Sequence, residues 1–142
     1  MSFETSSADI VAHYSYPEGA AGPLLSAGTL IGNKVYNRKD EELGDIKELM
    51  LNTISGNVCY AVVAAGGFLS MGEKLYAVPW SALTLDTPNK RFVFDVDVDR
   101  FKHAPGFDKH QWPDMADETW AKKIHSFYGL QGAPVKGTAT EA

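Results

Sequence analysis

The stretch 57–80, "NVCYAVVAAGGFLSMGEKLYAVPW", contains the longest apolar run in the chain, at 58–65. The length of this run and its β-branched residues are typical of a buried strand. A second apolar segment, at 74–78, follows after a loop of glycine and turn residues. The stretch therefore predicts two strands joined by a hairpin.

Two glycines in this hairpin, Gly67 and Gly72, have the spacing found in a phosphate-binding loop, and Lys74 follows closely. In that pattern lysine comes directly after the second glycine and a hydroxyl residue comes next, whereas here these places hold Glu73 and Leu75. The pattern also needs a helix after the loop, because a helix N-terminus supplies the anion site. Since strands are expected on both sides, we interpret the glycines as turn residues with positive φ.

Three apolar residues, Phe68, Leu69 and Met71, lie in this otherwise solvent-facing turn. They either fold over one end of the domain or form a contact surface, since exposed apolar patches often mark interfaces. The three residues are therefore candidate interaction residues.

Short strands with turn residues between them make up the middle of the chain. The segments read as strands are 33–37, 45–52, 58–65, 74–78, 81–86 and 91–98. A one-residue break in the apolar alternation of the second segment suits a β-bulge. Because no helix separates the strands, we expect a mainly β fold, a small antiparallel barrel of about six strands or a sandwich.

The chain changes character after the last of these strands. "DVDRFKHAP" predicts a short helical turn that ends before Pro105, with Asp97 or Asp99 as its cap. A longer helix is predicted from Asp114, its N-cap, to Gly129. One face of this helix is apolar and must pack on its own barrel or on a partner. The candidate interaction residues of this region are Trp112, Trp120, Ile124, Phe127 and Tyr128.

Composition divides the 142 residues into four parts. We expect loosely ordered tails at 1–26 and 130–142, which are rich in small and polar residues, a barrel domain at 27–108, and a helical extension at 109–129. The net charge of −5 and the scattered basic residues argue against direct binding of nucleic acid. The single cysteine excludes an internal disulfide and a cysteine-based zinc site. With no signal sequence and no membrane-length apolar run, we expect a soluble, cytoplasmic protein.

Two acidic or histidine-containing groups are candidates for metal binding or catalysis. Asp95, Asp97 and Asp99 would share one face if the strand at 91–98 continued, but a straight strand spreads carboxylates apart, so a solvated strand edge is the favoured interpretation. His110 has aspartates nearby but lacks any zinc-binding spacing. We therefore expect no catalytic residues and no cofactor, with a metal at these four residues as the less favoured alternative.

Three blocks of the chain together resemble the PRC-barrel domain, named after the cytoplasmic domain of the photosynthetic reaction centre H subunit. These are "LIGNKVYNRKDEELGDIKELMLN", "NVCYAVVAAGGFLSMGEKLYAVPWSALTLD" and "RFVFDVDVDRFKHAPGFD", which cover about 30–108. The stretch 120–129, "WAKKIHSFYG", resembles the C-terminal extension of bacterial single-domain members. Asp40 stands where members often have glycine, and aspartate tolerates the same left-handed turn.

This resemblance implies a small β-barrel of about six strands that serves as an assembly or protein-binding module, without catalytic residues. We expect a non-enzymatic, stand-alone member that self-associates and binds another protein. A role in ribosome maturation or RNA metabolism, by analogy with a maturation factor that carries the same domain, is one alternative. Binding of a metal or small ligand is another. The expected lack of both a membrane helix and a preceding RNA-processing domain means that neither relative's specific role transfers.

Overall fold

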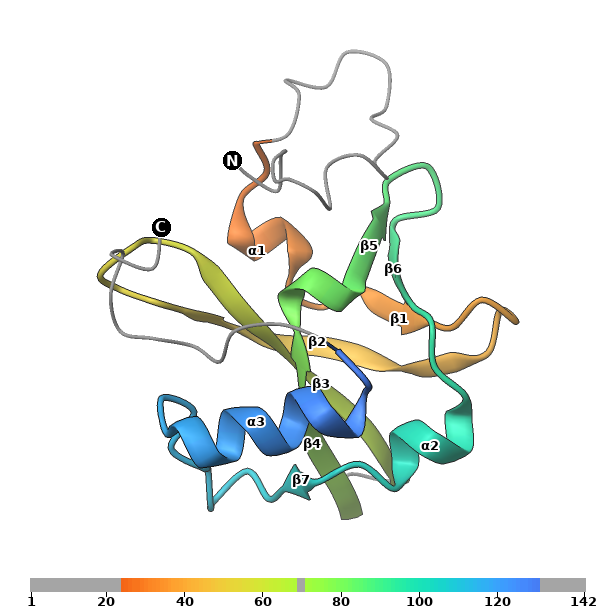
Figure 1. Ribbon diagram of the computed structural model, residues 1–142. Helices are drawn as coiled ribbons and strands as arrows, with labels where there is room; N and C mark the ends of the chain where they lie inside the picture. The colour runs from red at the N-terminus through yellow and green to blue at the C-terminus, as the bar shows by residue number, and fades with distance from the viewer. Residues whose placement is uncertain (1–23, 69–70, 131–142) are drawn as a thin grey trace.

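The computed structural model describes residues 24–68 and 71–130, with the backbone alone at 67–68 and 71–72. Its strands are β1 (Lys34–Tyr36), β2 (Glu42–Leu51), β3 (Val58–Phe68), β4 (Met71–Pro79), β5 (Leu83–Asp86), β6 (Arg91–Phe94) and β7 (Gly106–Phe107). Its helices are α1 (Ala27–Leu30), α2 (Val98–Lys102) and α3 (Glu118–Phe127), and a single 3-10 turn, η3 (Trp80–Ala82), joins β4 to β5. Figure 1 shows the helices arranged around one curved sheet.

The fold is mainly β, as expected, but the sheet is not closed into a barrel. Its seven strands lie in the order β5-β6-β1-β2-β3-β4-β7, so β5 and β7 are the two edges. The Trp80 ring, in the turn between β4 and β5, packs edge-on against the Phe92 ring of β6, with 5.7 Å between centroids. The expected closed barrel is thus replaced by a curled open sheet whose concave side holds the main core.

The expectation of a purely antiparallel sheet is also corrected. β6 runs parallel to β1, with Lys34 opposite Arg91 and Tyr36 opposite Val93. The crossover from β4 through η3 into the β5–β6 hairpin brings β6 alongside β1 in the same direction. All other neighbours in the sheet are antiparallel.

Both faces of β3 are buried, which explains its unbroken apolar sequence. Ala61 and Val63 belong to the main core inside the curl. Tyr60, Val62 and Ala64 alternate with them and face the other side, where the C-terminal part of the chain covers the sheet. The strand and hairpin predicted from 57–80 are therefore confirmed.

The bulge predicted in the second strand is confirmed, because the register of β2 against β3 shifts between Ile46 and Glu48. The strand predicted at 91–98, by contrast, ends at Phe94. Both of its neighbours end there, since Phe94 pairs with the first residue of β5 and Val93 with the last of β1. Beyond Phe94 the backbone has no strand to bond with, and it turns into α2.

Both helices predicted after the last strand are present, but the second one, α3, begins later than predicted. α2 begins after Asp97, one of the two aspartates predicted as its cap, although the Asp97 side chain makes no capping hydrogen bond. α3 begins at Glu118 rather than near Asp114, and its N-cap is Asp117, whose side chain accepts a hydrogen bond from the backbone N–H of Trp120. Asp114 instead closes a separate turn by accepting from the N–H of Ala116. Gly129 follows α3 with φ 68°, as a helix-terminating glycine should.

Candidate protein-interaction surface

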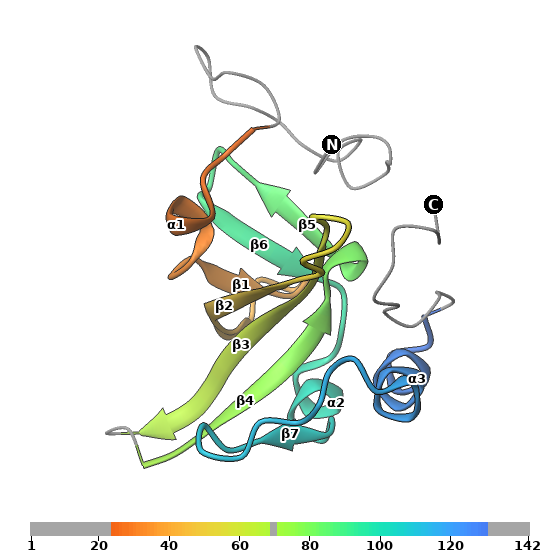
Figure 2. The same cartoon turned by 90° about the vertical axis from the view of Figure 1, so that its left-hand side faces the viewer.

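The β3–β4 hairpin extends beyond its neighbouring strands. β3 pairs with β2 only as far as Ala64, and β4 pairs with β7 only at Leu75 and Tyr76. Among the described strands, residues 65–68 and 71–74 therefore pair only with each other. We call these two segments the arm, and Figure 2 shows it pointing away from the rest of the sheet.

Two of the three apolar residues expected to form an interaction surface lie at the end of the described part of the arm. Phe68 and Met71 are the last pair of the ladder, and Leu69 lies outside the described residues. Gly66 has φ 82°, whereas Gly67 and Gly72, which were interpreted as turn residues, lie within β3 and β4. Glu73 and Lys74, at the base of the arm, are exposed. The arm therefore carries an apolar end bordered by one acidic and one basic residue.

The predicted apolar face of α3 packs on its own chain. Ile124 is completely buried, and the Trp120 ring meets the Tyr60 ring edge-on, with 5.3 Å between centroids. Tyr128, just after the helix, packs edge-on against Phe94 of the main core at 5.0 Å. The structure thus brings α3 together with the sheet.

The two remaining aromatic candidates lie at the margins of this contact. Phe127 is half-buried beside Tyr128. Trp112 is 41% exposed, and its ring packs on Phe107 of β7 at 5.0 Å. Trp112 is therefore the most accessible of the candidates on the C-terminal side of the molecule.

The three aspartates considered for metal binding do not share a strand face. Asp95 lies 3.4 Å from the Arg38 guanidinium and Asp97 lies 3.7 Å from the Lys39 ammonium. Asp99 belongs to the first turn of α2. His110 sits in a turn, where its backbone N–H donates to Asp108. Within 24–68 and 71–130, no three His, Cys, Asp or Glu side chains gather as a metal site would require.

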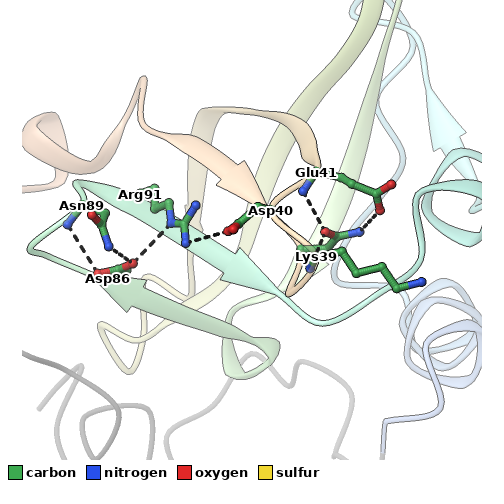
Figure 3. A network of polar contacts seen from close by, with 7 residues as sticks. Lys39, Asp40, Glu41, Asp86, Asn89 and Arg91 are labelled. Carbon is green, nitrogen blue, oxygen red and sulfur yellow. Dashed lines mark hydrogen bonds and ion pairs between the residues drawn. The ribbon is translucent and has the colours of Figure 1, made fainter.

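A polar network that the sequence did not reveal connects two turns of the sheet (Figure 3). Arg91 lies 3.2 Å from Asp86 through Nε and 3.0 Å from Asp40 through Nη2. Its guanidinium also stacks 4.9 Å from the Tyr36 ring centroid. Asn89 donates to Asp86 at 2.8 Å. The network therefore fastens the β5–β6 hairpin to β1 and to the β1–β2 turn.

The charges of this network are stabilised by their neighbours. The side-chain hydrogen bond from Asn89 is the main cause that lowers the pKa of Asp86; burial opposes it, and the hydrogen bond from Arg91 adds to the lowering. Burial acts to lower the pKa of Arg91, yet its hydrogen bonds with Asp40 and Asp86 leave that pKa raised. Asp40 has φ 62°, so the left-handed turn expected at this residue is confirmed. These groups serve the fold.

Two further apolar surfaces were missed by the sequence reasoning. Leu51 and Ile54, at the β2–β3 turn, are 55% and 67% exposed. Leu24, Leu25 and Ile31 are exposed on either side of α1. An apolar residue within a polar turn, as in "NTISGN", was the available signal for Ile54.

Comparison with known proteins identifies the family of the domain. The family model for the PRC-barrel domain matches residues 24–101, more than half of the chain. A crystal structure of RimM from Pseudomonas aeruginosa, described as a 16S ribosomal RNA processing protein, is similar over 58% of this chain, with 22% identity and a TM-score of 0.40. The match covers 49% of that protein, so this chain spans about half of its length. No protein of curated function matches.

No helix in the described part of the chain has the length and apolar character needed to cross a membrane. The resemblance inferred from the three sequence blocks is confirmed by the family match, which includes the hairpin, the arm and the Arg91 network. The chain belongs to the PRC-barrel domain family.

Proposed function

We propose that this chain is a non-enzymatic assembly module that binds other proteins through the arm, with a second copy of the chain as the first partner. The observation that carries the proposal is the position of Phe68 and Met71, two apolar residues at the end of a hairpin that outruns its neighbouring strands. A binding element of this kind needs a partner with an apolar recess.

Covering the tip of the arm has two favourable effects, on apolar area and on backbone pairing. Removing apolar surface from water is favourable by about 25 cal/mol per Å². A two-stranded hairpin without further neighbours is marginally stable in water. A partner that covers the tip therefore gains apolar burial and also stabilises the pairing of the arm. Glu73 and Lys74 border the tip as the polar rim of an interface does.

The use of the polar residues supports the non-enzymatic part of the proposal. Arg91 and Asp86 fasten two hairpins together. Asp97 precedes α2 and pairs with Lys39, and Asp117 caps α3. Of the residues that first suggested chemistry, Asp95 and Asp97 form ion pairs with Arg38 and Lys39, and the backbone N–H of His110 donates to Asp108 within a turn.

The proposal is tested by measuring the molar mass of the protein by light scattering over a wide range of concentration. The double variant Phe68→Ser with Met71→Ser should remain monomeric at concentrations where the parent associates. The matched control is Leu51→Ser with Ile54→Ser, which removes two exposed apolar residues from the other long hairpin. This control should associate like the parent.

A parent that stays monomeric at every concentration removes self-association from the proposal. Association that is lost in the control and kept in the arm variant assigns the interface to the β2–β3 turn instead. Capture of partners with the parent and the arm variant then tests heterologous binding, because a partner held by the arm is recovered only with the parent. Ribosomal proteins among those partners would support the accessory role in ribosome maturation.

A further inference from the structure

The β3 strand of the arm has an unpaired outer edge. β2 pairs with β3 only as far as Ala64, so the backbone groups of 65–68 that point away from β4 pair with no other strand in the described part of the chain. In Figure 2 the β3 side of the arm lies away from β7, which runs beside β4. Unpaired N–H and C=O groups at strand spacing are a template for one more extended strand.

This edge lacks the features that usually prevent a strand from pairing with another chain. Charged residues, proline and very short length are such features, and the segment 65–68, "AGGF", contains neither charge nor proline. The other strand of the arm carries Glu73 and Lys74. Of the two ends of the sheet, β7 has only two residues, and β5 includes Asp86, which pairs with Arg91. The β3 edge of the arm is therefore the edge best suited to strand pairing.

A second copy of the chain brings the same edge, and two identical edges match in an antiparallel pair about a two-fold axis. In such a pair the axis passes between two copies of one residue. Centred on Gly67, the pair stays clear of β2 and places Phe68 of each copy opposite Gly66 of the other. Gly66 is exposed and has no side chain, so it leaves space for an aromatic neighbour. A pair of β4 edges centred on Glu73 would instead place like charges opposite each other.

We propose that the arm associates by pairing its β3 edge with the β3 edge of a second copy. The two arms then form one four-stranded ribbon, in the order β4-β3-β3-β4. The glycines of each arm supply the apolar recess that the tip of the other arm needs. This inference rests on the proposed function, because it names the pairing that the arm makes with a second copy.

Disulfide cross-linking between copies tests the pairing. Opposite residues of an antiparallel pair have Cα atoms about 4.5 to 5.5 Å apart, within the range that a disulfide spans. Gly67→Cys in a Cys59→Ala chain should therefore shift from the monomer mass to the mass of a covalent dimer, when it is oxidised at a concentration where the parent associates. The matched control is Gly72→Cys in the same chain, on the other strand of the arm. In the ribbon its two copies lie three strand spacings apart, about 14 Å, so this control should stay monomeric.

The outcomes separate the pairing from the use of the arm. A Gly67→Cys chain that stays monomeric on oxidation, although light scattering shows that its reduced form associates, overturns the pairing and leaves the arm as the interface. Equal cross-linking of Gly72→Cys also overturns the pairing. A parent chain that never associates removes self-association through the arm, and this inference with it.

Amide exchange resolved by residue with NMR tests the unmodified chain, in case a cysteine variant does not fold. As the protein concentration rises, exchange should slow at the amides of 65–68 that point away from β4, because these groups gain hydrogen-bond partners. The amides of 71–74 that point away from β3 should not slow. Equal slowing of these two sets of amides contradicts the pairing of β3 edges.

Discussion

Gly44 lies in β2 opposite Val35 of β1, and next to Asp45, which pairs with Ala64 of β3. A Cβ atom at this position would overlap the carbonyl oxygen of Ala64 and approach the Val63 Cγ1 to 2.9 Å. The backbone and the core side chain on β3 have no room to move. Close passage of the two central strands therefore requires glycine at this residue.

Gly44→Ala should lower the free energy of unfolding by about 3 kcal/mol, the size expected when a core position is overfilled. Urea unfolding followed by circular dichroism measures the change. Gly28→Ala is the control, because a Cβ there meets nothing within 4 Å and alanine favours a helix. Equal stability of the two variants would show that β2 and β3 are not packed as described.

Acidification offers a second test at the residue scale. The folded state lowers the pKa of Asp86 through its hydrogen bonds from Asn89 and then from Arg91. The stability that this carboxylate supplies is therefore present above its unfolded pKa, which is about 3.9, and is lost as the pH falls through the lower folded pKa. Unfolding measured between neutral pH and strongly acidic pH should show a smaller acid loss for Asp86→Asn than for the parent. Parallel curves for the two proteins would contradict this role.

At the scale of elements, Arg100 joins the two C-terminal helices. Its guanidinium donates to the last carbonyl of α3, where a positive charge also favours the helix dipole. Arg100→Ala should reduce the protection of α3 amides against hydrogen exchange, by about 1 kcal/mol in opening free energy. Lys102→Ala, on the same helix and exposed, is the matched control. If both variants protect α3 equally, Arg100 does not hold the helix.

The sequence predicted those strands and helices whose limits are set by their own residues. The β3–β4 hairpin follows from its apolar runs and glycines, and α2 follows from a cap and a proline. The end of β6 at Phe94 depends instead on where β1 and β5 end. The two residues of β7 form a strand because β4 offers them a free edge at Leu75 and Tyr76. The ends of these strands are set by partner strands distant in sequence. The alternation of apolar residues therefore predicted β6 too long and did not predict β7.

The first residue of α3 was also not predictable from sequence alone. Asp114 and Asp117 both have the residue type and position of a helix cap. Asp114 accepts from Ala116 within a turn, and only Asp117 caps the helix. Residue type alone therefore did not decide which aspartate begins the helix.

At the scale of the whole molecule, the resemblance of three sequence blocks to the PRC-barrel domain predicted the family, and the match at 24–101 confirms it. The open form of the sheet, where a closed barrel was expected, and the parallel pairing of β1 with β6 were not predictable from periodicity, which indicates buried faces but not the relative direction of strands. The apolar tip residues of the candidate site were proposed from sequence because they interrupt a polar turn, and their role stays a prediction. The arm itself could not be predicted from sequence. It exists because β2 and β7 end before the end of the β3–β4 hairpin.

The central claim is that the arm is the surface through which the protein assembles. Hydrogen exchange of 65–68 and 71–74, measured by mass spectrometry at low and high protein concentration, tests it most directly. The amides of the arm should become more protected as concentration rises, because a partner covers and stabilises the isolated hairpin, while β5 and β6 should not change. Protection of the arm that is the same at every concentration would contradict the account.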